Sequence, residues 1–123
     1  MANRTAEAAA VFEPRAGAID LAHLERATFG DKALAREVLT LFDRQAEKLV
    51  AEIAGARSVR ALREAAHTLK GAARGVGAFA VAQAAEEMEA AVDNPELFAS
   101  TLAHLAALVA VARLAVAGLI ARD

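Results

Sequence analysis

The chain has 123 residues, enough for one domain with its own hydrophobic core. Hydrophobic residues make up 57% and aromatic residues 4%, and alanine dominates the apolar positions, so the composition favours helices over a β-sandwich, a barrel or disorder. A net charge of −2 argues against nucleic acid as the main partner. The absence of cysteine excludes thiol catalysis, disulfides and cysteine-bound zinc, and is compatible with the cytoplasm, where we expect the protein.

Residues 1–17 show no helical periodicity and contain Pro14 and Gly17. Charged residues interrupt every apolar run in this segment, so it does not resemble a signal peptide. We therefore expect a flexible leader at 1–17 and a single domain at 18–123.

The first two helices are predicted from their boundary residues. Asp20 is typical of an N-cap, and the short helix after it should end at Phe29 and Gly30. Asp31 then predicts the start of a long helix that extends to about Ala54. The apolar residues expected to form the inner stripe of that helix are Leu34, Val38, Leu41, Phe42, Leu49 and Ile53.

Three further helices follow. Ser58 predicts a helix to about Arg74, ended by the glycines of 75–77, and a fourth helix should cover about 79–92. Pro95 suits the first position of a last helix that runs to about 121. Four substantial helices with short connections, after one short helix, predict an all-α fold, an antiparallel up-down four-helix bundle.

The last two helices have distinct faces. In the fourth, the predicted core residues are Val81, Ala85, Met88 and Val92, and the predicted outer residues are Gln83, Glu86 and Glu87. Residues 102–120 approach the length of a membrane span but contain His104 and Arg113. Their strongest apolar positions recur at helical spacing, which predicts a bundle helix of a soluble protein and no membrane partner; these positions are Leu105, Leu108, Val109, Ala112, Val116 and Leu119.

The third helix places a histidine on its outer face. At about 100° per residue, Leu62, Leu69 and Val76 fall opposite His67, so His67 should lie at the centre of the solvent-facing side. The residues that share this side are Arg60, Arg63, Lys70, Gly71 and Arg74. An exposed imidazole among cationic side chains is a candidate site for an anionic group.

Gly71 is the second indication of function on this face. Glycine inside a helix costs about 1 kcal/mol relative to alanine. No core packing demands a small residue one turn after His67, so we expect close approach by something from outside. Lys70, beside Gly71, offers a flexible ammonium group that could meet an anion.

The run HTLKGAARGVGA at residues 67–78 resembles the signature of histidine-containing phosphotransfer (HPt) domains. That signature reads His-x-Leu-Lys-Gly, two small residues, a few variable ones, then an aliphatic residue and Gly-Ala. The resemblance covers about residues 19–121 and departs mildly, with alanines at 72 and 73 where serines are common. Further matching positions are Ala65, Ala66, Phe29-Gly30-Asp31, Leu41-Phe42 and Met88-Glu89.

The resemblance implies that His67 accepts a phosphoryl group through Nε2 from the aspartyl phosphate of a receiver domain and passes it to a second receiver. Lys70 would support the phosphoryl group and Gly71 would admit the receiver's loops. The implied partners are response-regulator receiver domains and a hybrid histidine kinase, with Mg²⁺ supplied by the receiver, no intrinsic cofactor, and a monomeric carrier. Candidate docking residues are Arg63, Arg74 and Phe42.

Two other functions compete with this one. In the phosphoacceptor domain of a histidine kinase, an acidic residue follows the histidine and a proline stands five residues on, where this chain has Thr68 and Ala72. No glycine-rich ATP-binding domain is present, so we expect no ATP-dependent kinase activity. A non-catalytic adaptor that binds receivers without accepting phosphate is the other alternative.

The remaining polar residues carry no predicted chemistry. We expect His23 and His104 to be ordinary surface or boundary residues, and His67 alone would be interpreted in the same way without the motif around it. The glutamates at 86, 87 and 89 are expected on the solvated side of their helix. With no cysteine and three scattered histidines, the sequence gives no support for a metal site.

Overall fold

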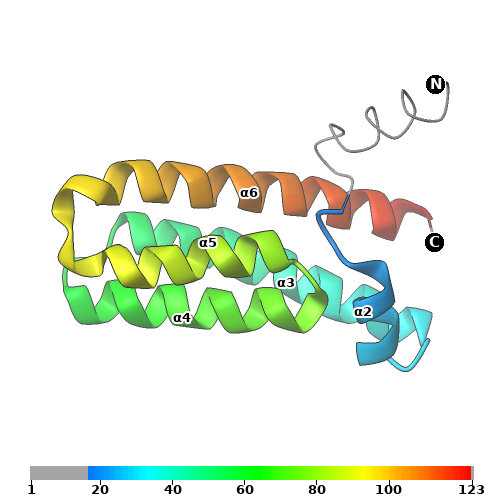
Figure 1. The fold of residues 1–123 in the computed structure, drawn as a ribbon. Helices are drawn as coiled ribbons and strands as arrows, with labels where there is room; N and C mark the ends of the chain where they lie inside the picture. Colours follow the sequence, from blue (N-terminus) through cyan, green and yellow to red (C-terminus); the bar gives the residue numbers. More distant parts are fainter. Residues whose placement is uncertain (1–16, 123) are drawn as a thin grey trace, which may run out of the picture.

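The computed structural model describes residues 17–122, which form five α-helices and one turn of 3₁₀ helix (Figure 1). All but Gly17 of the predicted leader lies outside the described residues. In chain order the elements are α2 (Leu21–Ala27), α3 (Lys32–Ala54), α4 (Val59–Val76), α5 (Phe79–Ala90), η1 (Ala91–Asp93) and α6 (Pro95–Arg122).

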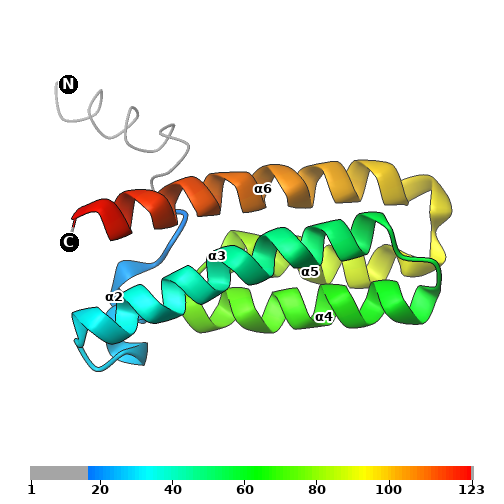
Figure 2. The same cartoon turned by 180° about the vertical axis from the view of Figure 1, so that it is seen from behind.

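The four long helices form the predicted antiparallel bundle, which confirms the all-α fold. Helix α3 packs on α4 and α6, and α5 packs on the same two helices. Consequently α4 and α6 lie diagonally across the bundle, as the two opposite views show (Figures 1 and 2). The short α2 packs on α4.

Three predicted N-caps hold the starts of α2, α3 and α4. Asp20 accepts a hydrogen bond from the His23 amide at 3.0 Å, and Asp31 accepts one from the amide of Leu34 at 3.1 Å. The Ser58 hydroxyl oxygen accepts one from the third residue of α4 at 3.0 Å. Each cap satisfies an amide that has no partner within its helix.

The inner stripe of α3 differs from the predicted one at its centre. Leu39 is 4% exposed and Phe42 is 2% exposed, whereas Leu41 is 58% exposed. The buried residues recur at intervals of three and four, and this line passes through Leu39 and Phe42 and misses Leu41. The buried residues of α3 are Leu39, Phe42, Ala46, Leu49 and Ile53.

The prediction that Phe42 is a docking residue is therefore wrong. Its ring lies in the hydrophobic core with the other large, fully buried side chains. A partner on the surface cannot reach it.

Two helix ends also differ from expectation. Helix α4 continues through Gly75 to Val76 and ends at Gly77, which has φ +84°. Helix α5 ends at Ala90, and the predicted last turn is instead the 3₁₀ turn η1. Because α4 passes Gly75, the helix is about half a turn longer than predicted.

Among the described residues α6 is the one helix long and apolar enough to cross a membrane by length and composition, a test that apolar helices of soluble bundles also pass. Arg113, near its middle, forms ion pairs with Asp43 at 2.8 Å and Glu47 at 2.7 Å on α3. Arg36 of α3 donates a hydrogen bond to the carbonyl oxygen of Ile120 at 2.8 Å. These contacts hold α6 against α3.

Candidate functional site

His67 lies on the outer side of α4, and 70% of its side chain is exposed. Ala66 and Leu69, its near neighbours along the helix, are fully buried. Because those residues hold the opposite side of α4 in the core, His67 projects into solvent. This confirms the predicted position of His67 at the centre of the exposed face.

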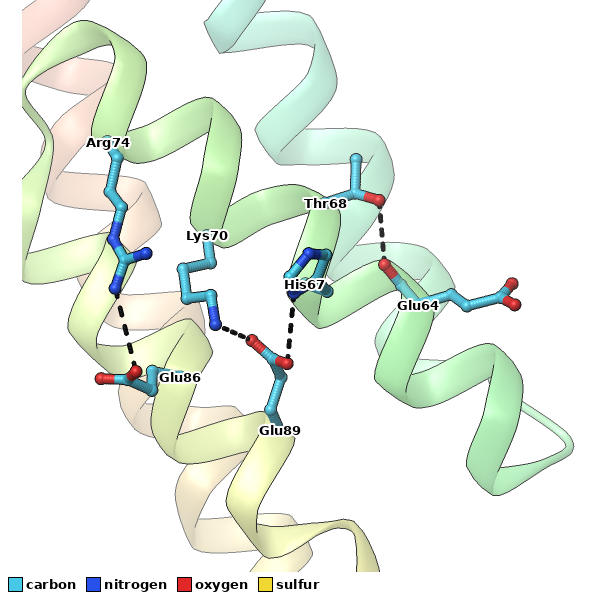
Figure 3. A network of polar contacts seen from close by, with 7 residues as sticks. All are labelled: Glu64, His67, Thr68, Lys70, Arg74, Glu86 and Glu89. Carbon is cyan, nitrogen blue, oxygen red and sulfur yellow. Dashed lines mark hydrogen bonds and ion pairs between the residues drawn. The ribbon is translucent and has the colours of Figure 1, made fainter.

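The imidazole of His67 faces a carboxylate from the neighbouring helix (Figure 3). Nδ1 of His67 lies 3.4 Å from Oε2 of Glu89 on α5. A neutral imidazole that carries its proton on Nδ1 donates toward this carboxylate, and its lone pair then belongs to Nε2. The arrangement therefore favours Nε2 as the free, outward nucleophile.

Lys70 completes the network from one turn further along α4. Its Nζ lies 2.7 Å from Oε1 of Glu89, and only 14% of the lysine side chain is exposed (Figure 3). The sequence predicted a flexible ammonium able to meet an anion. In the unphosphorylated protein the anion that it meets is the Glu89 carboxylate, and the ion pair supports Glu89 beside His67.

Glu89 itself was expected on the solvated side of α5. This expectation is wrong, because only 20% of its side chain is exposed. Partial burial by itself raises the pKa of Glu89, but hydrogen bonds and positive charge from Lys70 and His67 outweigh burial and leave the pKa below its ordinary value. The carboxylate is thus anionic at neutral pH, next to the candidate nucleophile.

The lowered pKa of Glu89 predicts a pH-dependent contribution to stability. A carboxyl whose pKa is lower in the folded state stabilises the protein above its unfolded pKa, near 4.5, and loses that effect as the pH falls through the folded value. Glu89→Gln should lower the free energy of unfolding by roughly 1–2 kcal/mol at pH 7. The difference from wild type should shrink as the pH falls below 4.5, as denaturant titrations at pH 7 and at a series of acidic pH values would measure. A difference of constant size would contradict the assignment.

Two arginines flank the site on the side of α5. Arg63 lies 3.8 Å from Asp93, and Arg74 lies 3.8 Å from Glu86. Both arginine side chains are about half exposed, so they remain accessible while they face carboxylates. Glu86 is on the solvated side of α5, as predicted.

The opposite flank of His67 carries little side-chain bulk. A Cβ atom added to Gly71 would meet no atom within 4 Å. The Thr68 hydroxyl donates to the carbonyl oxygen of Glu64 at 2.9 Å, so its polar group is satisfied within the helix (Figure 3). Gly71 therefore leaves open space next to the imidazole, as the sequence predicted.

The other histidines have separate environments. The His23 ring lies edge-on to Phe79, with 5.1 Å between ring centroids, and His104 lies 4.0 Å from Glu87. Within residues 17–122, no group of three or more His, Cys, Asp or Glu side chains could hold a metal ion.

Comparison with known proteins adds one match. A model of the family described as "Hpt domain" matches residues 32–117, more than two-thirds of the chain. This range contains His67, Lys70, Gly71 and Glu89. No curated protein and no solved structure matched the chain.

Proposed function

Because the chain belongs to the Hpt domain family, which implies phosphotransfer in two-component phosphorelays, we propose that His67 is the residue that carries the phosphoryl group. One observation carries this proposal. His67 is 70% exposed, with its Nδ1 toward Glu89 and its Nε2 available to a partner.

In the proposed step, the Nε2 lone pair of His67 attacks the phosphorus of an aspartyl phosphate on a receiver domain. The N–P bond forms as the P–O bond to the aspartate breaks, and the bonding electron pair leaves with the aspartate carboxylate. The imidazole then carries a positive charge, with its proton still on Nδ1. Glu89, 3.4 Å from Nδ1, stabilises that charge. Transfer to a second receiver is the same step in reverse.

Such phosphoryl transfer depends on positioning and charge neutralisation. Lys70 positions Glu89 through their 2.7 Å ion pair, and the open space at Gly71 admits the receiver's loops. Arg63 and Arg74 contact the receiver at the rim of the site. Mg²⁺ is supplied by the receiver, and the partners are receiver domains and a hybrid histidine kinase in the cytoplasm.

Gly71 provides a test of the docking geometry. Gly71→Gln should raise the free energy of unfolding by about 0.5–1 kcal/mol, because it removes a helix-destabilising glycine from open space. The same change should slow transfer from a phosphorylated receiver several-fold by crowding the approach to His67. Thermal melts and rapid-quench transfer rates measure the two effects. Gly71→Ala, the smaller control, should gain stability with less loss of rate, and faster transfer in Gly71→Gln would contradict this role.

The proposed function is tested directly by charging a receiver domain with a small-molecule phosphodonor and mixing it with this protein and Mg²⁺. Acid-labile, base-stable phosphate should appear on the peptide that contains His67, as mass spectrometry would locate. A second, unphosphorylated receiver added afterwards should remove it. Absence of label with every receiver tried would favour a binding adaptor with the same fold.

A further inference from the structure

The outer face of α6 is an exposed surface without charge. Between residues 103 and 121 every exposed side chain of this helix is apolar except His104; these exposed residues are Ala103, His104, Ala107, Ala110, Leu114, Ala117, Gly118 and Ala121. In the most apolar 18-residue stretch of α6, only 22% is buried. Leu114 is 57% exposed and Leu97 is 46% exposed. An uncharged, mostly apolar helix face of this kind is a candidate interaction site.

The exposed positions follow one line along the helix. Ala103, Ala107, Ala110, Leu114, Ala117 and Ala121 are separated alternately by four and three residues. This interval keeps a seam facing a second helix, and small side chains let two backbones approach closely. Arg113, the one charged residue within this stretch, is held by Asp43 and Glu47 on α3.

The charges at the ends of α6 indicate what covers this seam. Glu96 stands in its first turn and Arg122 in its last turn. In an antiparallel pair of α6 helices, each Glu96 approaches the Arg122 of the other copy, whereas a parallel pair places like charges together. A membrane surface would instead favour an excess of lysines and arginines along the flanks. The flanks of α6 carry Asp43, Glu47 and Glu87 beside Arg36 and Arg113, so no cationic excess is present there.

We propose that α6 pairs with α6 of a second copy of this chain, antiparallel and centred near Ala110, to form a homodimer. At 1.5 Å per residue the 28-residue helix offers a seam about 42 Å long. Because α4 lies diagonally across the bundle from α6, both His67 side chains remain exposed in the dimer (Figures 1 and 2). The proposal does not depend on phosphotransfer, and it departs from the monomer expected from the family resemblance.

Cysteine crosslinking tests the geometry, since the natural chain contains no cysteine. Ala110→Cys places two thiols near the two-fold axis and should give a disulfide-linked dimer on mild oxidation. Ala103→Cys should not link to itself but should link when mixed with Ala117→Cys. Efficient self-linking of Ala103→Cys would overturn the antiparallel arrangement.

The mass in solution tests the dimer itself, by light scattering on the full-length chain across a range of concentrations. The wild type should show twice the chain mass at high concentration. Ala110→Glu should be a folded monomer with unchanged phosphoryl uptake, and Ala80→Glu, on the exposed surface of α5, should remain a dimer. A monomeric wild type at every concentration overturns the proposal, and sedimentation of that monomer with anionic vesicles would assign the face to lipid.

Discussion

Replacing His67 by glutamine should abolish phosphoryl uptake from a phosphorylated receiver and leave the fold intact. The His67 side chain is 70% exposed and makes one long contact, at 3.4 Å, so its loss removes little packing. Glutamine is a good helix former but has no nucleophilic ring nitrogen. Uptake measured with labelled phosphate should fall below detection, while circular dichroism and the melting temperature stay close to those of the wild type.

A matched control variant and a binding measurement distinguish a phosphoryl carrier from an adaptor that only binds receivers. His104→Gln, at another exposed histidine on α6, should take up phosphate like the wild type. Affinity for the receiver, measured by calorimetry, should change less than about threefold in His67→Gln, since a carrier also has to dock. Uptake that survives in His67→Gln would contradict the proposed site, and a wild type that binds but never takes up phosphate would be an adaptor.

Removal of the Glu89 carboxylate should produce the second large effect. Glu89→Ala should slow transfer by roughly ten- to a hundredfold, by analogy with the range found when the partner that orients a metal-bound histidine is removed. The physical reason is twofold, because the carboxylate holds the proton on Nδ1 and offsets the positive charge that develops on the ring. Glu89→Gln keeps a hydrogen-bond acceptor but not the charge, so its rate should lie between those of wild type and Glu89→Ala.

Imidazole ¹⁵N chemical shifts show whether Glu89 orients the His67 ring or only stabilises the fold. The wild type should show the tautomer with its proton on Nδ1 of His67, and Glu89→Ala should show a larger share of the other tautomer. Glu86→Ala is the control on the same helix, because Glu86 is exposed and faces Arg74 and not the histidine. If both the transfer rate and the tautomer of His67 are unchanged in Glu89→Ala, Glu89 has no role in transfer and serves only to pair with Lys70.

Much of this fold is encoded in local signals that the sequence displays. Asp20, Asp31 and Ser58 each precede an apolar periodic run, and a cap needs only the amides three residues away. His67 could be placed because α4 is strongly amphipathic, so the buried side of the helix determines the exposed one. Gly71 was identified because it costs helix stability where no packing requires it.

The errors lie where the outcome depends on a second helix. Glu89 and His67 are 22 residues apart, and their contact depends on how α5 rotates against α4, which the weakly patterned, alanine-rich α5 does not specify. Lys70 lies at the edge of the exposed face, and its side chain turned toward α5 because a carboxylate was there. Leu41 and Phe42 are adjacent apolar residues, and only one of them can face the core at this point of α3. Phe42, which has the larger side chain, is buried, and Leu41 is exposed.

The junction between α2 and α4 has a consequence for motion. The Asp20 amide donates to the Gly77 carbonyl at 2.9 Å, and a Cβ at Gly77 would lie only 2.9 Å from the Asp20 carbonyl oxygen. Gly77 thus ends α4 and also holds the start of α2 against it. Helix α2 has seven residues, and its one buried side chain is Leu24. We expect so small a unit to open at lower free energy than the four long helices. Hydrogen exchange should therefore show the amide protons of α2 exchanging before those of the long helices, while the bundle that holds His67 stays closed.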